Sequence, residues 1–355
     1  MAADNKRVIL RSRPGADNAP TIDNFTCEQC EYPATIKDGE VVIKTLYLSL
    51  DPAMRCRLND DSGVDYIKPI EIGKTVQGLG AVGEIIDSKN EQFMKGDIVQ
   101  SVTNWPWMKY FTAKTDDPSF PLLKVDSAVR DNPQIVLSLL GLSGLTSYLG
   151  VKNKGHVTSG ANQTFVVSGA AGSCGNLAGQ IAKLLGAKKV VGICGSDLKC
   201  DVLKSELNFD STINYKTDNI PDRLKELCPD GIHSYFDNVG GTLSEHVIRQ
   251  MSPNSHIILC GQIAVYNKDV PYPPPISEEI QSIMKDRNIT RDRFLVLNYQ
   301  DQFNEGIKQL QEWYLSGQLK VPEYVHEGIE STVTAFVNMM TSVKQEKVGK
   351  QMVKV

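Results

Sequence analysis

A turn of small residues near the middle of the chain has the composition of a phosphate-binding loop. The β-branched run 164–167 predicts a strand, and apolar residues at helical spacing from Ala178 onward predict a helix after it. Gly172 and Gly175 lie between them and allow close approach, whereas Ala170 replaces the first glycine of the usual dinucleotide fingerprint. Because the first amides of a helix attract anions, the turn indicates a pyrophosphate site. A turn that holds no ligand remains the alternative.

A second glycine pattern lies earlier in the chain and matches the fingerprint more literally. Residues 78–83 read Gly-Leu-Gly-Ala-Val-Gly, which satisfies G-x-G-x-x-G. The residues after it, 84–87, have the pattern of a short strand, so no helix N-terminus is available for an anion. We therefore interpret this segment as a bent strand.

The next strand along the chain, after the helix that follows the glycine turn, indicates which dinucleotide binds. NAD-binding sheets place an acidic residue there, about 20 residues past the glycine turn, to bind the ribose 2′-hydroxyl. Here 190–196 contains no acid, Gly195 leaves room, and Asp197 falls past the strand as an expected helix N-cap. Lys199 and Tyr215 could meet a 2′-phosphate, although Lys199 alone could be an ordinary surface lysine. We expect NADPH rather than NADH.

Metal-assisted chemistry would need Cys and His ligands near the reaction centre. The first 130 residues hold Cys27, Cys30 and Cys56 but no histidine, and all five histidines lie from His156 onward. No Cys/His pair has the spacing of a catalytic zinc site, so we expect no metal. The Cys27–Cys30 spacing fits the two faces of a strand, with a metal or redox role as the alternative.

Without a metal, a nicotinamide can still reduce a double bond conjugated to a carbonyl. Hydride adds to the β-carbon, and the negative charge that develops on the carbonyl oxygen needs hydrogen-bond donors in a dry cleft. A tyrosine hydroxyl suits this role because it stays protonated at neutral pH. Tyr66 and Tyr266, both on predicted loops, are the candidates, and a phenol without a catalytic role is the alternative for each.

The predicted secondary structure that must position these residues changes along the chain. A length of 355 residues predicts about two domains. The first part has short strand-like runs between turn residues, typical of a barrel or sandwich, at 7–10, 25–31, 41–50, 81–86, 98–102 and 110–113. Later, strands alternate with helices, which requires parallel strands in a doubly wound sheet, at 164–167, 189–193, 211–215, 234–238 and 256–260.

The expected domain boundaries follow from this change. We expect a β-rich catalytic domain over 1–130, a nucleotide-binding domain over 131–305, and a C-terminal return to the catalytic domain over 306–355. Residues 294–297 are predicted as a further strand and 303–314 as a helix. The tail from Val321 is predicted as a helix followed by an edge strand, and Gly186 is expected to end the helix after the glycine turn.

Net charge and the lengths of the apolar runs argue against a nucleic-acid partner, a membrane partner and secretion. The net charge is −4, which gives no reason to expect nucleic acid or an anionic membrane. No stretch approaches the roughly 18 apolar residues of a membrane span, and the N-terminal residues lack a signal-peptide core. We expect a cytoplasmic protein whose eight cysteines are reduced. Whether it is a monomer or a homodimer stays open.

Six longer stretches make the chain similar to a known family: 45–57, 166–175, 235–241, 257–263, 266–275 and 288–299. The chain resembles the zinc-free medium-chain dehydrogenase/reductase family over nearly its full length, and within it the NADPH-dependent 15-oxoprostaglandin 13-reductases. The resemblance implies an α/β Rossmann domain with a doubly wound parallel sheet, joined to a GroES-like β-barrel catalytic domain. It also implies reduction of the 13,14 carbon–carbon double bond of a small lipid enone, a 15-oxoprostaglandin.

The resemblance further implies roles for individual residues. Tyr66 and Tyr266 would hydrogen-bond the enone oxygen. NADPH would contact Gly172, Ser173, Cys174, Gly175, Lys199, Tyr215, Asn238, Cys260, Gly261, Gln262, Ile263, Ala264, Val265, Tyr266, Phe294, Leu295 and Val296. The substrate would contact Thr103, Asn104, Leu295, Val296 and Leu297.

Three departures from the family pattern concern the substrate cleft. Ala53 stands where a tyrosine is expected, Thr103 and Asn104 lie where the pattern is aromatic, and 342–347 is longer than the usual glycine-rich turn. A broad alkenal or quinone reductase of the same family is therefore one alternative. A nucleotide-binding adaptor that has lost catalysis is the other, because a fold alone does not establish a function.

Overall fold

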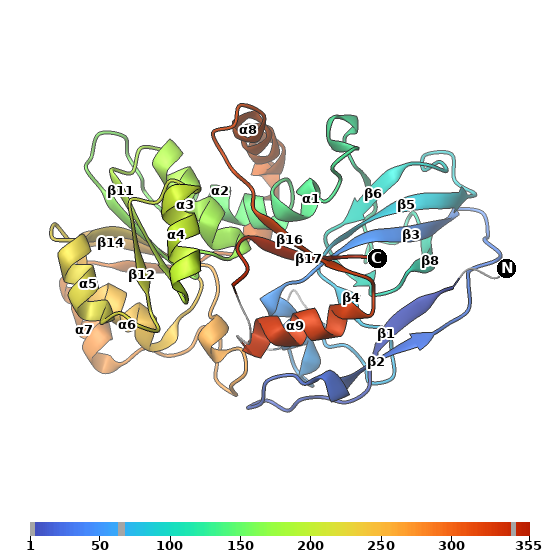
Figure 1. Cartoon of the computed structure of the whole chain (residues 1–355), viewed down its shortest axis with the longest axis horizontal. Coiled ribbons are helices and arrows are strands. Elements are labelled where there is room, and N and C mark those ends of the chain that lie inside the picture. Colours follow the sequence, from blue (N-terminus) through green and yellow to red (C-terminus); the bar gives the residue numbers. More distant parts are fainter. Residues whose placement is uncertain (1–3, 63–67, 342–345) are drawn as a thin grey trace.

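In the computed structural model, which describes residues 4–62, 68–341 and 346–355, the chain forms two units built on separate sheets (Figure 1). The first unit is β-rich and contains both the beginning and the end of the chain. The second unit is a parallel sheet with helices on both faces. The predicted fold class, a Rossmann domain joined to a β-type catalytic domain, is confirmed.

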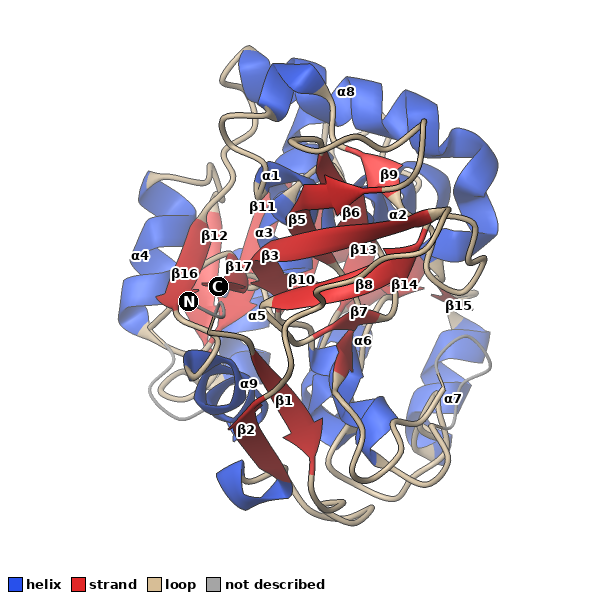
Figure 2. Cartoon of the chain, turned by 90° about the vertical axis from the view of Figure 1, so that its right-hand side faces the viewer, coloured by secondary structure: helices blue, strands red, loops and turns tan. Residues whose placement is uncertain are grey.

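The first unit combines strands from the N-terminal part of the chain with strands from its C-terminal part (Figure 2). They are β1 (Lys6–Leu10), β2 (Phe25–Gln29), β3 (Glu40–Ser49), β4 (Gln77–Gly78), β5 (Ala81–Ser88), β6 (Ile98–Ser101), β7 (Trp105–Pro106), β8 (Tyr110–Lys114), β9 (Leu123–Lys124), β16 (Glu323–Glu327) and β17 (Lys350–Lys354). The main sheet has the order β16-β17-β3-β5-β6-β9, and β8 also pairs with β3. All six predicted runs form strands.

Aromatic side chains and one helix fill the core of the first unit. Trp105 packs edge-on against Phe111, with ring centroids 5.2 Å apart. Trp107 packs against Phe336 of α9 (Ser331–Thr341) at 5.9 Å, which joins this C-terminal helix to the N-terminal strands. The short 3-10 helices η1 (Ile22–Asn24) and η2 (Pro52–Leu58) lie between strands, and η3 (Ser127–Val129) follows β9.

The glycine pattern at 78–83 lies in strands, as predicted. Gly78 ends β4, and Gly83 lies within β5. A Cβ on Gly83 would come within 2.5 Å of Ile43 Cγ2 on the neighbouring strand. Glycine therefore permits close packing of β5 on β3 here, and no helix follows that could bind an anion.

The second unit is a doubly wound sheet in which every strand pair is parallel. Its strands are β10 (Thr164–Ser168), β11 (Lys189–Cys194), β12 (Ser211–Asn214), β13 (Ile232–Asp237), β14 (Met251–Leu259) and β15 (Thr290–Arg293), in the order β12-β11-β10-β13-β14-β15. Its helices are α2 (Leu142–Lys154), α3 (Ser173–Leu184), α4 (Asp197–Ser205), α5 (Ile220–Leu227), α6 (Gly241–Arg249) and α7 (Glu278–Asp286). Gly186 follows α3 with φ +105°, so it ends that helix as predicted.

Alternation along β10 explains why helices cover both faces of this sheet. Phe165 and Val167 pack into the core shared with α2 and α3. Val166, between them, packs into the core shared with α5, α6 and α7. Successive strand residues point to opposite faces, so a continuous apolar run is buried on both sides.

Three sequence expectations were wrong in detail. Residues 294–297 are not a strand: β15 precedes them with the polar sequence Thr-Arg-Asp-Arg, and Val296 begins the 3-10 helix η5 (Val296–Gln302). The strand β16 was not expected, and because it pairs with β17, the last strand is not at the sheet edge. Asp197 is not the N-cap of α4, since Ser196 occupies that position and accepts a hydrogen bond from Lys199 N.

The C-terminal return begins later than residue 306. Helix α8 (Phe303–Leu315) packs on the second unit, where Trp313 contacts Tyr148 of α2 with ring centroids 5.7 Å apart. The chain then enters the first unit, and β17 pairs antiparallel with β3. The segment leading into β17 also contacts the second unit, because Gly349 N donates to Ala171 O at 2.8 Å.

Contrary to the expectation from the sequence, one apolar stretch among the described residues has the length and composition of a membrane span. It covers Ile135–Lys154, that is α1 (Ile135–Ser138) and α2, with a mean hydropathy of 1.5 over its best window. Within the protein, 83% of that window is buried. Helix α2 packs against α3 and the sheet, so we interpret the stretch as part of the core.

The packing of α3 on the chain before β12 generates a stability prediction. A Cβ on Gly179 would lie 2.0 Å from Phe209 Cζ. We expect Gly179→Ala to lower the free energy of unfolding by about 1–3 kcal/mol, because the aromatic ring must shift. Urea denaturation measures the change, with Gly80→Ala as control, since its nearest contact would be an ordinary 3.6 Å. Equal stability of the two variants would contradict this packing.

Candidate active site

The predicted cofactor residues follow the carboxyl ends of the parallel strands. The glycine turn follows β10, Tyr215 follows β12, Asn238 follows β13, and Cys260 follows β14. Phe294 directly follows β15. Because the carboxyl ends of parallel strands lie at one edge of the sheet, the structure brings these segments together where nucleotides bind in this architecture.

The turn after β10 fits a pyrophosphate. Gly172 is the N-cap of α3, and the amides of the next residues, Ser173 to Gly175, have no acceptor within the helix. A Cβ on Gly175 would lie 2.3 Å from Gly169 O, so the tight turn itself requires glycine there. Ser173 Oγ is buried without a hydrogen-bond partner among the described residues, as expected of a donor aimed at a ligand.

Helix α4, which follows β11, carries a cation, Lys199, and the short connection before it contains Gly195. A Cβ on Gly195 would lie 2.8 Å from the Tyr215 ring, so glycine makes room for that ring. No carboxylate in the described part of the chain pairs with Lys199. Burial is the main cause that lowers the pKa of Lys199, and the charge of nearby Lys216 adds to it. A bound anion such as a 2′-phosphate would supply the counter-charge that Lys199 lacks and so favour its protonated form. The sequence analysis did not identify Lys216 as a second cation close to Lys199.

A buried carboxylate fixes the two loops that follow β13 and β14. Asp237 is 1% exposed and accepts hydrogen bonds from six donors: Ser168 Oγ, Tyr235 Oη, Val239 N, Gly240 N, Ser244 Oγ and Gln262 Nε2. Asn238 donates to Ser168 O at 2.8 Å. Sequence reasoning missed Asp237, although a lone acid at a strand end before Asn-Val-Gly-Gly was a signal.

The loop after β14 carries Tyr266 to the junction of the two units. The loop contains the 3-10 helix η4 (Ile263–Val265), and the Tyr266 side chain packs against the core of the first unit. Its hydroxyl accepts a hydrogen bond from Gln262 N at 3.3 Å. Burial is the main cause that raises the pKa of Tyr266 well above its usual value. The other candidate, Tyr66, lies outside the described residues.

The predicted substrate residues come from both units. Phe294 and Val296 are buried, and Phe294 stacks on Tyr299 at 5.2 Å. Leu295 and Leu297 are partly buried beside them, and Thr103 lies in the loop between β6 and β7. Asn104 Oδ1 accepts from Arg57 at 3.1 Å and its Nδ2 donates to Ser119 O at 2.8 Å, so protein atoms already engage this side chain.

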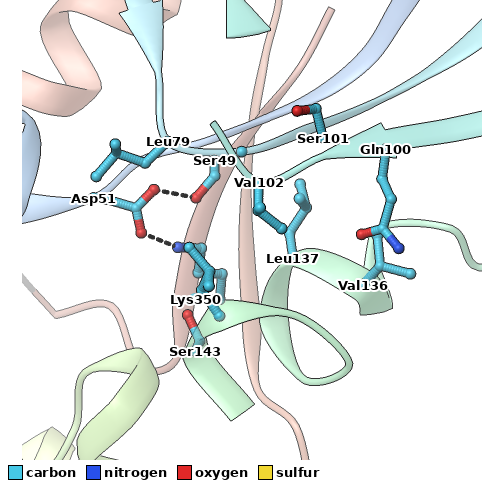
Figure 3. A pocket seen from close by; sticks show the side chains of 12 residues that line it. Ser49, Asp51, Leu79, Gln100, Ser101, Val102, Val136, Leu137, Ser143 and Lys350 are labelled. Atoms are coloured by element: carbon cyan, nitrogen blue, oxygen red, sulfur yellow. Dashed lines mark hydrogen bonds and ion pairs between the residues drawn. The ribbon is translucent and has the colours of Figure 1, made fainter. Parts of the chain in front are cut away.

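A small cavity lies at the junction, lined by both units and the C-terminal strand (Figure 3). Lys350, only 3% exposed on its side chain, donates to Asp51 Oδ1 at 2.6 Å, and the Ser49 hydroxyl donates to the other oxygen. The thiol of Cys174 lies near this ion pair. Its pKa is lowered, first by a hydrogen bond with Cys260 and then by the Lys350 charge, against the effect of burial.

No group of three or more His, Cys, Asp or Glu side chains in the described ranges is arranged to hold a metal ion. Cys27 and Cys30 are free thiols, and burial is the main cause that raises the pKa of each. Cys27 lies in β2, whereas Cys30 lies just past its end, so the two thiols do not occupy the two faces of one strand as the spacing predicted. Partly buried thiols with raised pKa values still agree with a packing role for this pair.

Comparisons with known proteins support the assignment of both units. Residues 6–118 match the N-terminal domain of oxidoreductase, and residues 174–312 match zinc-binding dehydrogenase. The putative NADP-dependent oxidoreductase YfmJ of Bacillus subtilis is 39% identical over 356 residues, which is 100% of this chain and 99% of that protein. Prostaglandin reductase 1 of Bos taurus is 36% identical over 339 residues, 94% of this chain and 95% of that protein.

A solved structure extends the likeness to the fold. CurA of Vibrio vulnificus in complex with NADPH superposes with a TM-score of 0.87 at 30% identity, and the match covers 99% of each chain. The chain therefore belongs to the medium-chain dehydrogenase/reductase family, among its zinc-free, NADP-dependent oxidoreductases. The glycine turn, the unpartnered Ser173 hydroxyl and the unpaired Lys199 fit NADPH.

The Lys199 cation generates a cofactor prediction. We expect Lys199→Ala to weaken NADPH binding by about 10- to 100-fold, the value of a charge-assisted hydrogen bond, and to leave NADH binding nearly unchanged. Fluorescence titration with each nucleotide measures the two affinities. Lys204→Ala on the same helix is the control, because Lys204 is exposed and pairs with Asp201. Equal losses for both nucleotides would show that Lys199 does not bind the 2′-phosphate.

Proposed function

We propose that the chain is an NADPH-dependent reductase of α,β-unsaturated ketones that acts on the 13,14 double bond of 15-oxoprostaglandins. The observation that carries the proposal is the Tyr266 hydroxyl at the junction of the two units. Its oxygen accepts a hydrogen bond from Gln262 N, and no acceptor for its proton is found among the described side chains. The proton is therefore available to a substrate oxygen.

The chemistry follows from where charge develops. When bound, NADPH supplies the hydride that adds to the β-carbon of the enone. Tyr266 donates its O–H to the carbonyl oxygen as that oxygen becomes negative, with Tyr66 as the second proposed donor. The raised pKa of Tyr266 keeps its hydroxyl protonated over the whole neutral range. Water then protonates the α-carbon.

The choice of a prostaglandin rests on residues narrower than the family pattern. The stretches 266–275 and 288–299 resemble those of prostaglandin reductase 2, the 15-oxoprostaglandin 13-reductase. The first stretch begins with Tyr266, and the second contains the segment 294–297. The relative named prostaglandin reductase 1 supports the same substrate class. Partly buried Leu295 and Leu297 offer an apolar wall to a lipid chain.

One observation favours a broader alkenal or quinone reductase as the second candidate. The Asn104 amide is engaged by Arg57 and Ser119, so it has less capacity to select a polar prostaglandin tail. Ala53, at a position where a tyrosine is expected, likewise offers the substrate a methyl group and no hydrogen-bonding atom of its side chain.

Removal of the Tyr266 hydroxyl tests the mechanism. We expect Tyr266→Phe to lower kcat by about 10²–10³-fold, because one oxyanion donor is lost, while NADPH still binds. The protonated form of Tyr266 is the proposed donor, and its pKa in the folded protein is raised. We therefore expect that the wild-type kcat does not fall through deprotonation of Tyr266 between pH 7 and 10. Tyr324→Phe, an exposed phenol on β16, is the control. NADPH binding without oxidation in the wild type would instead favour an adaptor.

Competing substrates test the prostaglandin assignment. We expect kcat/KM for a 15-oxoprostaglandin to exceed that for a short alkenal by about tenfold or more, since the longer chain contacts the segment 294–297. Spectrophotometric NADPH oxidation with each enone gives both values. A preference for the short alkenal would assign the chain to the broader reductases.

A further inference from the structure

A fully buried guanidinium lies next to the loop that carries Tyr266. Arg55, in η2, is 0% exposed, and no carboxylate in the described ranges forms an ion pair with it. Its nitrogens donate instead to neutral oxygens: Asn267 Oδ1 at 3.1 Å, Asn59 Oδ1 at 2.6 Å, and the carbonyls of Gly15, Ala16 and Asn18 at 2.8, 3.4 and 2.9 Å. A buried charge without a counter-ion is costly, so these hydrogen bonds must compensate for lost hydration.

One of these bonds connects Arg55 to the candidate catalytic loop. Asn267 is the residue directly after Tyr266, so Arg55 Nε holds the side chain of the residue next to the proposed proton donor. The Asn267 amide also donates to Met340 O in α9 at 3.2 Å. The first unit therefore holds this position of the loop from two elements.

The loop 15–18 provides a second connection. Its carbonyls accept from Arg55, and its Asp17 carboxylate accepts a hydrogen bond from Asp269 N at 2.8 Å. The loop itself is exposed, whereas the guanidinium that supports it is fully buried. Loss of Arg55 would therefore release Asn267 directly and Asp269 through the loop.

We propose that Arg55 is a positioning residue for Tyr266, which fixes the loop 266–269 of the nucleotide unit against the first unit. Arg55 acts through Asn267 and the loop 15–18 and needs no contact with substrate. The inference rests on the proposed function, because it assumes that Tyr266 is the oxyanion donor. A displacement of the donor by about 1 Å is enough to lower the rate about 10²-fold.

Arg57, two residues along the same 3-10 helix, offers a matched control. It is 3% exposed, and burial lowers its pKa as it does that of Arg55. Among the described residues, its acceptors all lie in the first unit: Lys68 O, Gln77 O, Gln77 Oε1 and Asn104 Oδ1. Replacement of Arg57 therefore removes a comparable buried guanidinium without touching the loop of Tyr266.

A double-mutant cycle tests the proposal on the full-length enzyme. We expect Arg55→Met to lower kcat by about 10- to 100-fold in the wild-type background and by less than about threefold when Tyr266 is already phenylalanine. NADPH affinity should change little in either background. Arg57→Met should change kcat/KM by the same factor in both backgrounds, since it does not act through Tyr266.

The outcomes separate this inference from the function on which it rests. Equal losses from Arg55→Met in both backgrounds would overturn the positioning role and leave the function of Tyr266 intact. No loss from Tyr266→Phe itself would overturn both.

A second pair of variants applies if Arg55→Met does not fold. Asn267→Ala removes the acceptor, whereas Asn267→Asp keeps an oxygen for Arg55 Nε. We expect about a tenfold loss of kcat for the first and recovery of most activity for the second. Equal losses in the two Asn267 variants would also contradict the proposal.

Discussion

The placement of the loop after β14 is the constraint on which the rest of the site depends. On one side, the buried Asp237 carboxylate binds Gln262 and so fixes the loop to the nucleotide sheet. On the other side, Tyr266 packs into the core of the first unit, and Asn267 bonds to Arg55. A donor that is held before the reaction needs no reorganisation when charge appears on the substrate oxygen. In the proposed site, the same loop would therefore form part of the cofactor wall and set the direction of the phenol.

The C-terminal segment provides the other link between the two units. β17 completes the sheet of the first unit through β3, and Lys350 pairs with Asp51 at 2.6 Å in the junction. Just before it, Gly349 N donates to Ala171 O in the turn of the proposed pyrophosphate site, and the φ of +88° at Gly349 suits glycine. The chain thus passes twice between the units, which limits how far the cleft can change shape without breaking a buried ion pair.

Local patterns predicted most of the fold, and tertiary contacts decided what they missed. The β-branched run of β10 and the helix that ends at Gly186 follow from residue types alone. The strand β16 could not be recognised, because an edge strand with the sequence Glu-Tyr-Val-His-Glu has little apolar content. At the site, the chemistry of an oxyanion predicted Tyr266 as a hydrogen-bond donor, and that role stays a prediction. Asp237 and Arg55 were missed because their roles depend on acceptors and donors distant in the sequence.

A crystal structure of the ternary complex with NADP⁺ and a 15-oxoprostaglandin tests the central claim most directly. The account predicts that Tyr266 Oη lies about 2.7–3.1 Å from the ketone oxygen, with the substrate chain along residues 294–297. It also predicts that Gln262 N still donates to that hydroxyl, as it does at 3.3 Å here. A ketone oxygen bound by other donors, with the Tyr266 hydroxyl turned away from it, would contradict the account.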